Sequence, residues 1–183
     1  MSLGRGIGRC APGRRAIGVT LTETLVAILV MSSGALGLAG LQAESLRAGR
    51  EAYERSVAVQ RAADMLDRIR ANRAVPAIEF EVGTGAPVFQ DCMSGACGAP
   101  EMARFDLAAW KCAIGGWRDD AACVQIREMD ALPGADAMSG LPEGDGTVVV
   151  STGGDTGDVV TVTVSWRPPG RRSRLGVAMT SGV

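Results

Sequence analysis

Histidine is absent from the 183-residue sequence, and lysine occurs only once, at Lys111. Histidine is the side chain that most often serves as a general base or a metal ligand near neutral pH. Without it, neither a Ser-His-Asp nor a Cys-His catalytic arrangement can form. The sequence also lacks a Walker-type phosphate loop and a G-x-G-x-x-G motif after a predicted strand. We therefore predict that the protein is not an enzyme and that it has no cofactor and no bound metal.

Acidic residues are absent from the first 18 positions, which hold four arginines: Arg5, Arg9, Arg14 and Arg15. Removing these four from the 19 basic residues leaves 15, against 20 acidic residues, so the rest of the chain has a net charge of −5. Nucleic-acid-binding domains generally carry a basic surface. The composition therefore argues against nucleic acid as a partner.

Charge is also missing from residues 24–43, most of which are apolar. A helix of about 20 such residues is long enough to cross the hydrocarbon core of a bilayer. Because basic residues precede this stretch, the positive-inside rule keeps the N-terminus in the cytoplasm and sends the rest of the chain outward. We expect one membrane-spanning segment followed by an exported region.

The exported region contains four of the five cysteines, Cys92, Cys97, Cys112 and Cys123. An even number of cysteines in an oxidising compartment indicates two disulfides. Three pairings are possible, of which Cys92–Cys97 with Cys112–Cys123 is the nearest-neighbour one, and the sequence leaves the choice open. A zinc site made of four thiolates is the alternative, but the spacing C-x4-C-x14-C-x10-C lacks the paired C-x2-C of zinc ribbons.

Helix-forming residues continue without a proline from Ala43 to Arg73, which predicts one long helix over residues 19–73. Val75-Pro76 then ends the helix, because proline disfavours helical backbone in the residue before it. Leu46, Tyr53 and Val57 lie on nearly the opposite face from an apolar stripe. That stripe consists of Ala58, Ala62, Met65, Leu66 and Ile69.

Residues 74–183 are expected to form a head that ends in an antiparallel sheet. Loops at 77–100 and around Leu132-Pro133-Gly134 flank a short helix at about 101–113. Three strands are predicted at 147–150, 159–166 and 174–179, and the second places Val160, Val162, Val164 and Trp166 on one face. Asp155 and Asp158 lie between the first two strands; they could bind calcium, but a solvated turn explains them more simply.

Glu23 lies one residue before the uncharged stretch. A carboxylate at membrane depth costs roughly 2.5–3.5 kcal/mol at the centre of a helix and less towards its end, and such groups are usually paired. Cleavage after Gly18 would create an ammonium group on Val19, only four residues away. In the first helical turn, a carboxylate also complements the unsatisfied N–H groups and the helix dipole. In an array of parallel staggered helices, Glu23 of one subunit would meet the terminal amine of the next.

The stretch GVTLTETLVAILV, at residues 18–30, resembles the class III signal of type IV prepilins, which combines a basic leader, a glycine, a cleavage site and a glutamate at the fifth position of an apolar helix. A larger set of segments is similar to the PilV-type minor pilins, the type IV pilus modification proteins. These segments are residues 24–47, the first cysteine pair, FDLAAWK at 105–111, LPG at 132–134 and VTVTVSW at 160–166.

The resemblance implies an α+β type IV pilin fold, in which a long N-terminal helix packs on an antiparallel β-sheet head. Residues 1–18 would be the prepilin leader, residues 19–73 the helix with its transmembrane half at 24–43, and residues 74–183 the head. It further implies cleavage between Gly18 and Val19 by prepilin peptidase, N-methylation of Val19 and an assembly role for Glu23.

The implied function is that of a minor pilin that takes part in type IV pilus assembly or priming. Its partners would be prepilin peptidase, the major pilin and other minor pilins, the latter two through the N-terminal helix. The protein would lie in the inner membrane with a periplasmic head and then in the pilus. The alternatives are a pseudopilin of a type II secretion system, a binding domain secreted by cleavage before Gly40, and an uncleaved single-pass membrane protein.

Overall fold

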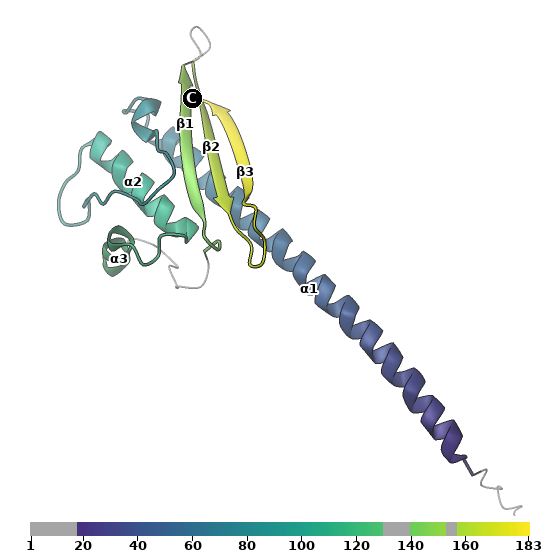
Figure 1. The fold of residues 1–183 in the computed structure, drawn as a ribbon. Coiled ribbons are helices and arrows are strands. Elements are labelled where there is room, and N and C mark those ends of the chain that lie inside the picture. The colour runs from purple at the N-terminus through teal and green to yellow at the C-terminus, as the bar shows by residue number, and fades with distance from the viewer. Residues whose placement is uncertain (1–17, 130–139, 153–156) are drawn as a thin grey trace, which may run out of the picture. The chain divides into compact units, whose positions relative to one another are not determined.

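The computed structural model describes residues 18–129, 140–152 and 157–183. The protein is α+β, with a long N-terminal helix followed by a three-stranded antiparallel sheet, which confirms the predicted fold class. It divides into two compact units, the first ending at Leu46 and the second comprising Arg47–Val183. The elements, drawn in Figure 1, are α1 (Leu21–Ala71), η1 (Ala77–Phe80), α2 (Ala99–Ile114), α3 (Ala121–Glu128), β1 (Asp145–Thr152), β2 (Asp158–Trp166) and β3 (Leu175–Gly182).

The described part of the first unit consists mainly of the N-terminal portion of α1. Its side chains are exposed all around the helix, although most of them are apolar. A helix that is hydrophobic on every side is stable only in a protein core or in a membrane. Within the described residues, α1 is the one helix that is long and apolar enough, by length and composition, to cross a membrane.

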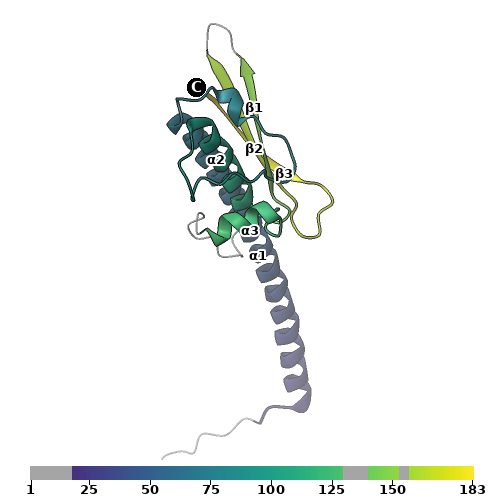
Figure 2. The same cartoon turned by 90° about the vertical axis from the view of Figure 1, so that its left-hand side faces the viewer.

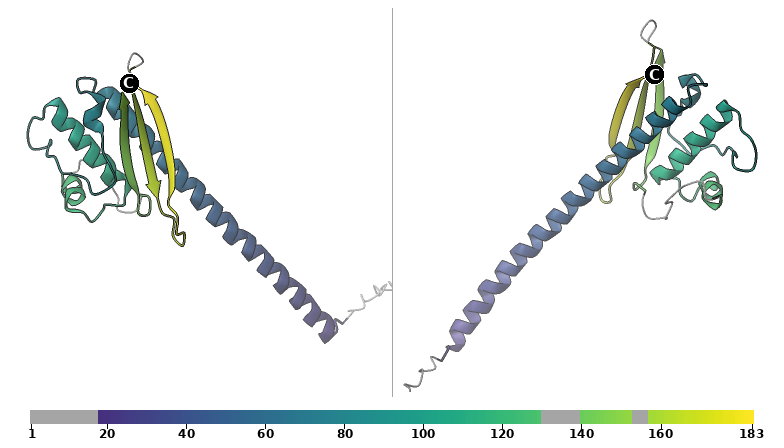
Figure 3. Two further views of the ribbon diagram at one scale, coloured as in Figure 1. Left: turned by 45° about the horizontal axis from the view of Figure 1, so that its top comes forward. Right: turned by 180° about the vertical axis from the view of Figure 1, so that it is seen from behind.

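The core of the second unit lies between the C-terminal part of α1 and one face of the sheet, as Figure 3 shows from behind. The predicted stripe on α1 is buried, and so is the predicted apolar face of β2, which confirms both patterns. The buried residues on these two faces are Ala58, Ala62, Met65, Leu66 and Ile69 of α1, and Val160, Val162, Val164 and Trp166 of β2.

Val57, on nearly the opposite face from the stripe, is partly buried and packs against the core. The loop at Leu141 and Pro142 also covers α1 and widens the buried face of the helix beyond the stripe. Tyr53, on the same side of the helix, is exposed over 62% of its surface.

The sheet has the order β1-β2-β3, and each neighbouring pair is antiparallel. Val162 in the central strand pairs with Val148 of β1 and with Met179 of β3. The strands are longer than predicted, since β1 starts at Asp145 and β3 ends at Gly182. Val82, which follows η1, also forms a bridge to Val148, so the chain after α1 is partly ordered by the sheet.

Helix α2 begins at Ala99, two residues before its predicted start. Pro100 lies in the first turn, where its missing N–H removes no helical hydrogen bond. The helix ends at Gly115, which has a φ of 108°, and a Cβ there would lie 2.6 Å from the Cα of Gly140. Glycine is therefore required both by the left-handed backbone and by the close approach of the second chain segment.

Helix α3 was not predicted from the sequence. It has eight residues, and Asp120 caps it by accepting a hydrogen bond from the backbone N of Ala122 at 2.9 Å. Such a short helix is marginal by itself and depends on packing. Cys123 and Ile126 supply that packing, because both are buried against α2.

Candidate functional site

The start of α1 is organised by Thr20, the last residue before the helix. Its hydroxyl accepts a hydrogen bond from the backbone N of Glu23 at 3.3 Å, and its carbonyl accepts one from the backbone N of Thr24 at 3.2 Å. The sequence Thr20-Leu21-Thr22-Glu23 has the T-x-x-E pattern of a capping box. This local signal for the helix start was overlooked in the sequence, although it is readable there.

The cap places Glu23 in the first turn of α1, where a carboxylate complements the free N–H groups of the helix end. Gly18 and Val19 precede the helix and are exposed. Within the part of the chain that the structure describes, the side chain of Glu23 has no hydrogen-bonding or ionic partner. The residues predicted for processing and assembly therefore lie together at one accessible helix end.

The two serines in the apolar part of α1 are satisfied by the helix itself. Ser32 donates a hydrogen bond to the carbonyl of Ile28, and Ser33 donates one to the carbonyl of Val30 at 2.9 Å. Such bonds to the preceding turn remove the need for an external partner in a membrane. Glu23 differs from these serines, because no such bond is available to its carboxylate.

Two disulfides connect the four cysteines of the second unit in the nearest-neighbour pairing. Cys92 and Cys97 have a Cα–Cα distance of 5.4 Å, and Cys112 and Cys123 have one of 5.3 Å. The second bond joins α2 to α3 inside a small apolar cluster. Across the described ranges, no group of three or more His, Cys, Asp or Glu side chains is placed to hold a metal ion.

The segment FDLAAWK fastens α2 to the C-terminal part of α1, beside which α2 lies in Figure 2. Asp106 forms an ion pair with Arg68 of α1 at 2.7 Å. The indole Nε1 of Trp110 donates a hydrogen bond to the carbonyl of Arg61 at 2.7 Å. These contacts give the segment an architectural role.

The last residue of that segment, Lys111, is buried and pairs with Asp145 of β1. Its Nζ lies 3.2 Å from Oδ1 of Asp145 and donates hydrogen bonds of 2.7 Å to the carbonyls of Gly83 and Gly85. All these partners are needed, because an ammonium removed from water is costly unless it is paired and hydrogen-bonded.

Asp145 is equally well satisfied. Burial by itself would raise the pKa of its carboxyl, but hydrogen bonds from the backbone N of Gly85, the indole of Trp117 and the backbone N of Gly146, together with the charge of Lys111, hold the pKa below its ordinary value. The pair thus joins α2, the loop at residues 83–85 and the start of β1.

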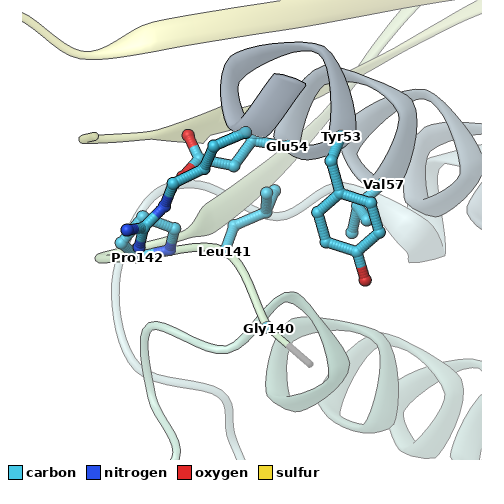
Figure 4. Close-up of a pocket in the computed structure, with 7 residues that line it drawn as sticks. Tyr53, Glu54, Val57, Gly140, Leu141 and Pro142 are labelled. Atoms are coloured by element: carbon cyan, nitrogen blue, oxygen red, sulfur yellow. The ribbon is translucent and has the colours of Figure 1, made fainter. Parts of the chain in front are cut away.

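A second buried carboxylate, Glu54, anchors α1 to β2. It accepts a hydrogen bond from the indole Nε1 of Trp166 at 3.0 Å and one from Arg50 at 3.3 Å. A cavity of about 130 Å³ lies beside it between α1 and the loop at 140–142, as Figure 4 shows. The sequence offered no signal for Glu54, because its partner Trp166 is 112 residues away.

Three sequence predictions fall on residues outside the described ranges, namely Leu132-Pro133-Gly134, Asp155 and the leader at residues 1–18, of which only Gly18 is described. Asp158 is described and begins β2, where its carbonyl accepts a hydrogen bond from the backbone N of Val183 at 3.0 Å.

Comparison with known proteins gives one family. Residues 40–108 match the family model described as Tt1218-like, type IV pilin Tt1218. This region contains the last residues of the uncharged stretch, the rest of α1, the first disulfide and the first part of α2. No curated protein and no solved structure matches the chain. Over residues 40–108 and in its α+β fold, with an apolar N-terminal helix ahead of an antiparallel sheet, the protein is similar to the type IV pilins.

Proposed function

We propose that the protein is a minor pilin of the PilV type, cleaved by prepilin peptidase between Gly18 and Val19, N-methylated at Val19 and assembled into a type IV pilus through α1. The observation that carries this proposal is the capped Glu23, whose side chain has no partner among the described residues, at the N-terminal end of an apolar helix of membrane-spanning length. Prepilin cleavage would place a new terminal amine four residues before this carboxylate.

The charges at this helix end favour a role for Glu23 in assembly. A carboxylate near the apolar region of a membrane gains free energy when it acquires a cation. An amine on Val19 of a neighbouring subunit is such a cation, and in a staggered array of parallel helices it would lie beside Glu23. The Thr20 cap holds Glu23 in the first helical turn, where the carboxylate can face a neighbouring helix.

The surface of the apolar helix supports contact with other helices. Gly34, Gly37 and Gly40 have open space where a Cβ would lie, so contacts within the described chain do not require glycine there. Small residues at such positions let neighbouring helices approach closely in a membrane or a filament. The major pilin and other minor pilins are the partners that this surface would contact.

The head fits a periplasmic location before assembly and the pilus afterwards. Its two disulfides suit an oxidising compartment. The FDLAAWK segment, which resembles a segment of PilV-type pilins, joins α1 to α2. A pseudopilin of a type II secretion system would be built in the same way and would be found with the secretion apparatus instead of sheared pili.

The test replaces Glu23 and measures incorporation. We expect Glu23→Ala and Glu23→Gln to be cleaved and to remain in the membrane, but to be depleted in sheared pili relative to the wild type. Glu23→Gln keeps the shape of the side chain, so its depletion would identify the charge as the requirement. Equal amounts of wild type and both variants in sheared pili would refute the assembly role.

A further inference from the structure

The turn between β2 and β3 concentrates positive charge on an otherwise acidic head. Residues 167–174 read RPPGRRSR and contain four arginines, and no acidic residue follows Asp158. Residues 75–166 contain four basic and 14 acidic residues, which is a net charge of −10. We call residues 167–174 the arginine turn. Its charge is opposite in sign to that of the rest of the head.

The backbone of the arginine turn is well defined. The backbone N of Arg171 donates a hydrogen bond of 3.1 Å to the carbonyl of Pro168, and Gly170 has a φ of 81°. This is the pattern of a type II turn, with proline and glycine at its two central positions. The backbone N of Arg167 also bonds to the carbonyl of Pro142 at 3.0 Å. The turn that carries the arginines therefore has a defined backbone conformation.

The arginine turn is attached to α1. Nη2 of Arg171 lies 2.8 Å from Oε1 of Glu51, although the two residues are 120 positions apart in sequence. Glu51 is eight residues beyond Ala43, the end of the uncharged stretch, so the arginine turn is attached to α1 at a residue close in sequence to that stretch.

Internal contacts neutralise only part of this charge. Arg167 pairs with the carboxylate of Glu143 at 2.9 Å, and Arg174 donates a hydrogen bond of 2.7 Å to the carbonyl of the same residue. Arg172 is exposed and has no partner within the described residues. Four arginines thus face two carboxylates, those of Glu51 and Glu143, and the arginine turn keeps an excess of positive charge.

We propose that the arginine turn binds the phosphate groups of anionic phospholipids at the surface of the membrane that α1 crosses, before the subunit leaves that membrane. The inference rests on the membrane anchoring contained in the proposed function. Guanidinium groups bind phosphate through paired hydrogen bonds. Because the rest of the head is acidic, an anionic surface attracts the arginine turn and repels the remainder, which orients the head.

The test uses the full chain in vesicles of phosphatidylcholine, with or without a third of phosphatidylglycerol. Exposed arginines are modified with phenylglyoxal, and the rate at each site is read by peptide mass spectrometry. We expect Arg172 and Arg174 to react about fivefold more slowly when phosphatidylglycerol is present. High salt should remove the protection. Arg104, which is exposed on α2, should react equally in both membranes.

A pair of charge reversals provides the matched control. Arg172→Glu should remove most of the protection of Arg174, whereas Arg104→Glu should leave it intact and Arg172→Lys should retain it. Because Arg172 has no partner in the described structure, its replacement is expected to leave the far-ultraviolet circular dichroism unchanged.

Equal rates in the two membranes would overturn the inference. Protection that rises with protein concentration instead of phosphatidylglycerol would also overturn it, and would point to the acidic head of a second copy as the occupant. Flotation of the same samples separates the two proposals. A chain that floats with unprotected arginines contradicts only the lipid contact, and a chain that does not float contradicts the anchor and with it the pilin function.

Discussion

Lys111 and Asp145 show how single residues hold the head together. Each side chain has at least three polar partners, and these come from α2, the loop at residues 83–85, β1 and Trp117. Removing one member of a buried ion pair leaves the other charge poorly compensated. The pair therefore makes the packing of α2 against β1 sensitive to single substitutions.

Replacing Lys111 with methionine tests this pair. The variant keeps an aliphatic side chain but loses three contacts of the ammonium group, so we expect its free energy of unfolding to fall by about 3 kcal/mol. Arg104→Met, on the exposed side of the same helix, should change the stability by less than about 0.5 kcal/mol. Chemical denaturation of the full chain in detergent measures both. Equal stabilities would show that Lys111 is dispensable for packing.

The lowered pKa of Asp145 makes a further prediction about pH. A group whose pKa is depressed in the folded state stabilises the protein above its unfolded pKa, which is about 3.9 for aspartate, and loses this contribution as the pH falls through the folded value. The wild type should therefore lose more thermal stability below about pH 4 than Asp145→Asn does. Melting temperatures between pH 7 and pH 3 measure the difference, and parallel curves would contradict it.

Thr20 is expected to order the start of α1. Thr20→Ala removes the hydroxyl that accepts from the backbone N of Glu23, at a cost of about 1 kcal/mol at the helix end. Amide hydrogen exchange at Glu23 and Thr24, whose backbone N–H groups bond to Thr20, should be about fivefold faster in this variant, and Thr20→Ser should exchange like the wild type. Unchanged exchange in Thr20→Ala would mean that the cap is not needed to form the first turn.

Among the elements, α3 depends most directly on a disulfide bond. The Cys112–Cys123 bond spans 11 positions and ends in two buried cysteines, whereas the Cys92–Cys97 bond closes a loop of five positions near the surface. Disulfides that close longer loops remove more entropy from the unfolded chain. Packing around a buried bond adds to this effect.

Double serine variants rank the two disulfides. We expect Cys112→Ser/Cys123→Ser to lower the free energy of unfolding by about 3 kcal/mol, and Cys92→Ser/Cys97→Ser to lower it by less. Thermal unfolding under non-reducing conditions measures both, and the double replacements avoid leaving a single free thiol. The opposite order would show that the surface loop contributes more to the fold than the joint between α2 and α3.

An element can be predicted from the sequence when a local pattern of residues stabilises it, and not when its stability comes from distant tertiary contacts. The alternation in β2 and the stripe on α1 are local patterns, so both were readable and both are buried as expected. Helix α3 was missed because eight residues hold too little periodicity, and its support comes from α2. The pairs Glu54–Trp166 and Arg171–Glu51 are tertiary contacts across more than 100 residues, which no local pattern encodes.

For the whole molecule, the distribution of charge and apolar surface indicates two different environments. The apolar surface of α1 is exposed all around the helix in the first unit, and the head is acidic apart from the arginine turn. Each unit would thus meet a partner suited to it, lipid or neighbouring helices for the first and an anionic surface for the arginine turn. Glu23 and the arginine turn are the two charged sites that would lie at the membrane.

Cleavage after Gly18 would create, at the N-terminal end of α1, the amine that pairs with Glu23 of a neighbouring subunit. The most direct test is the N-terminal mass of the protein recovered from membranes and sheared pili of piliated cells. Processing as a prepilin predicts a chain that begins at N-methylated Val19, with Glu23 as its fifth residue. A chain that begins at Gly40, or one that retains residues 1–18 in both fractions, would contradict the claim.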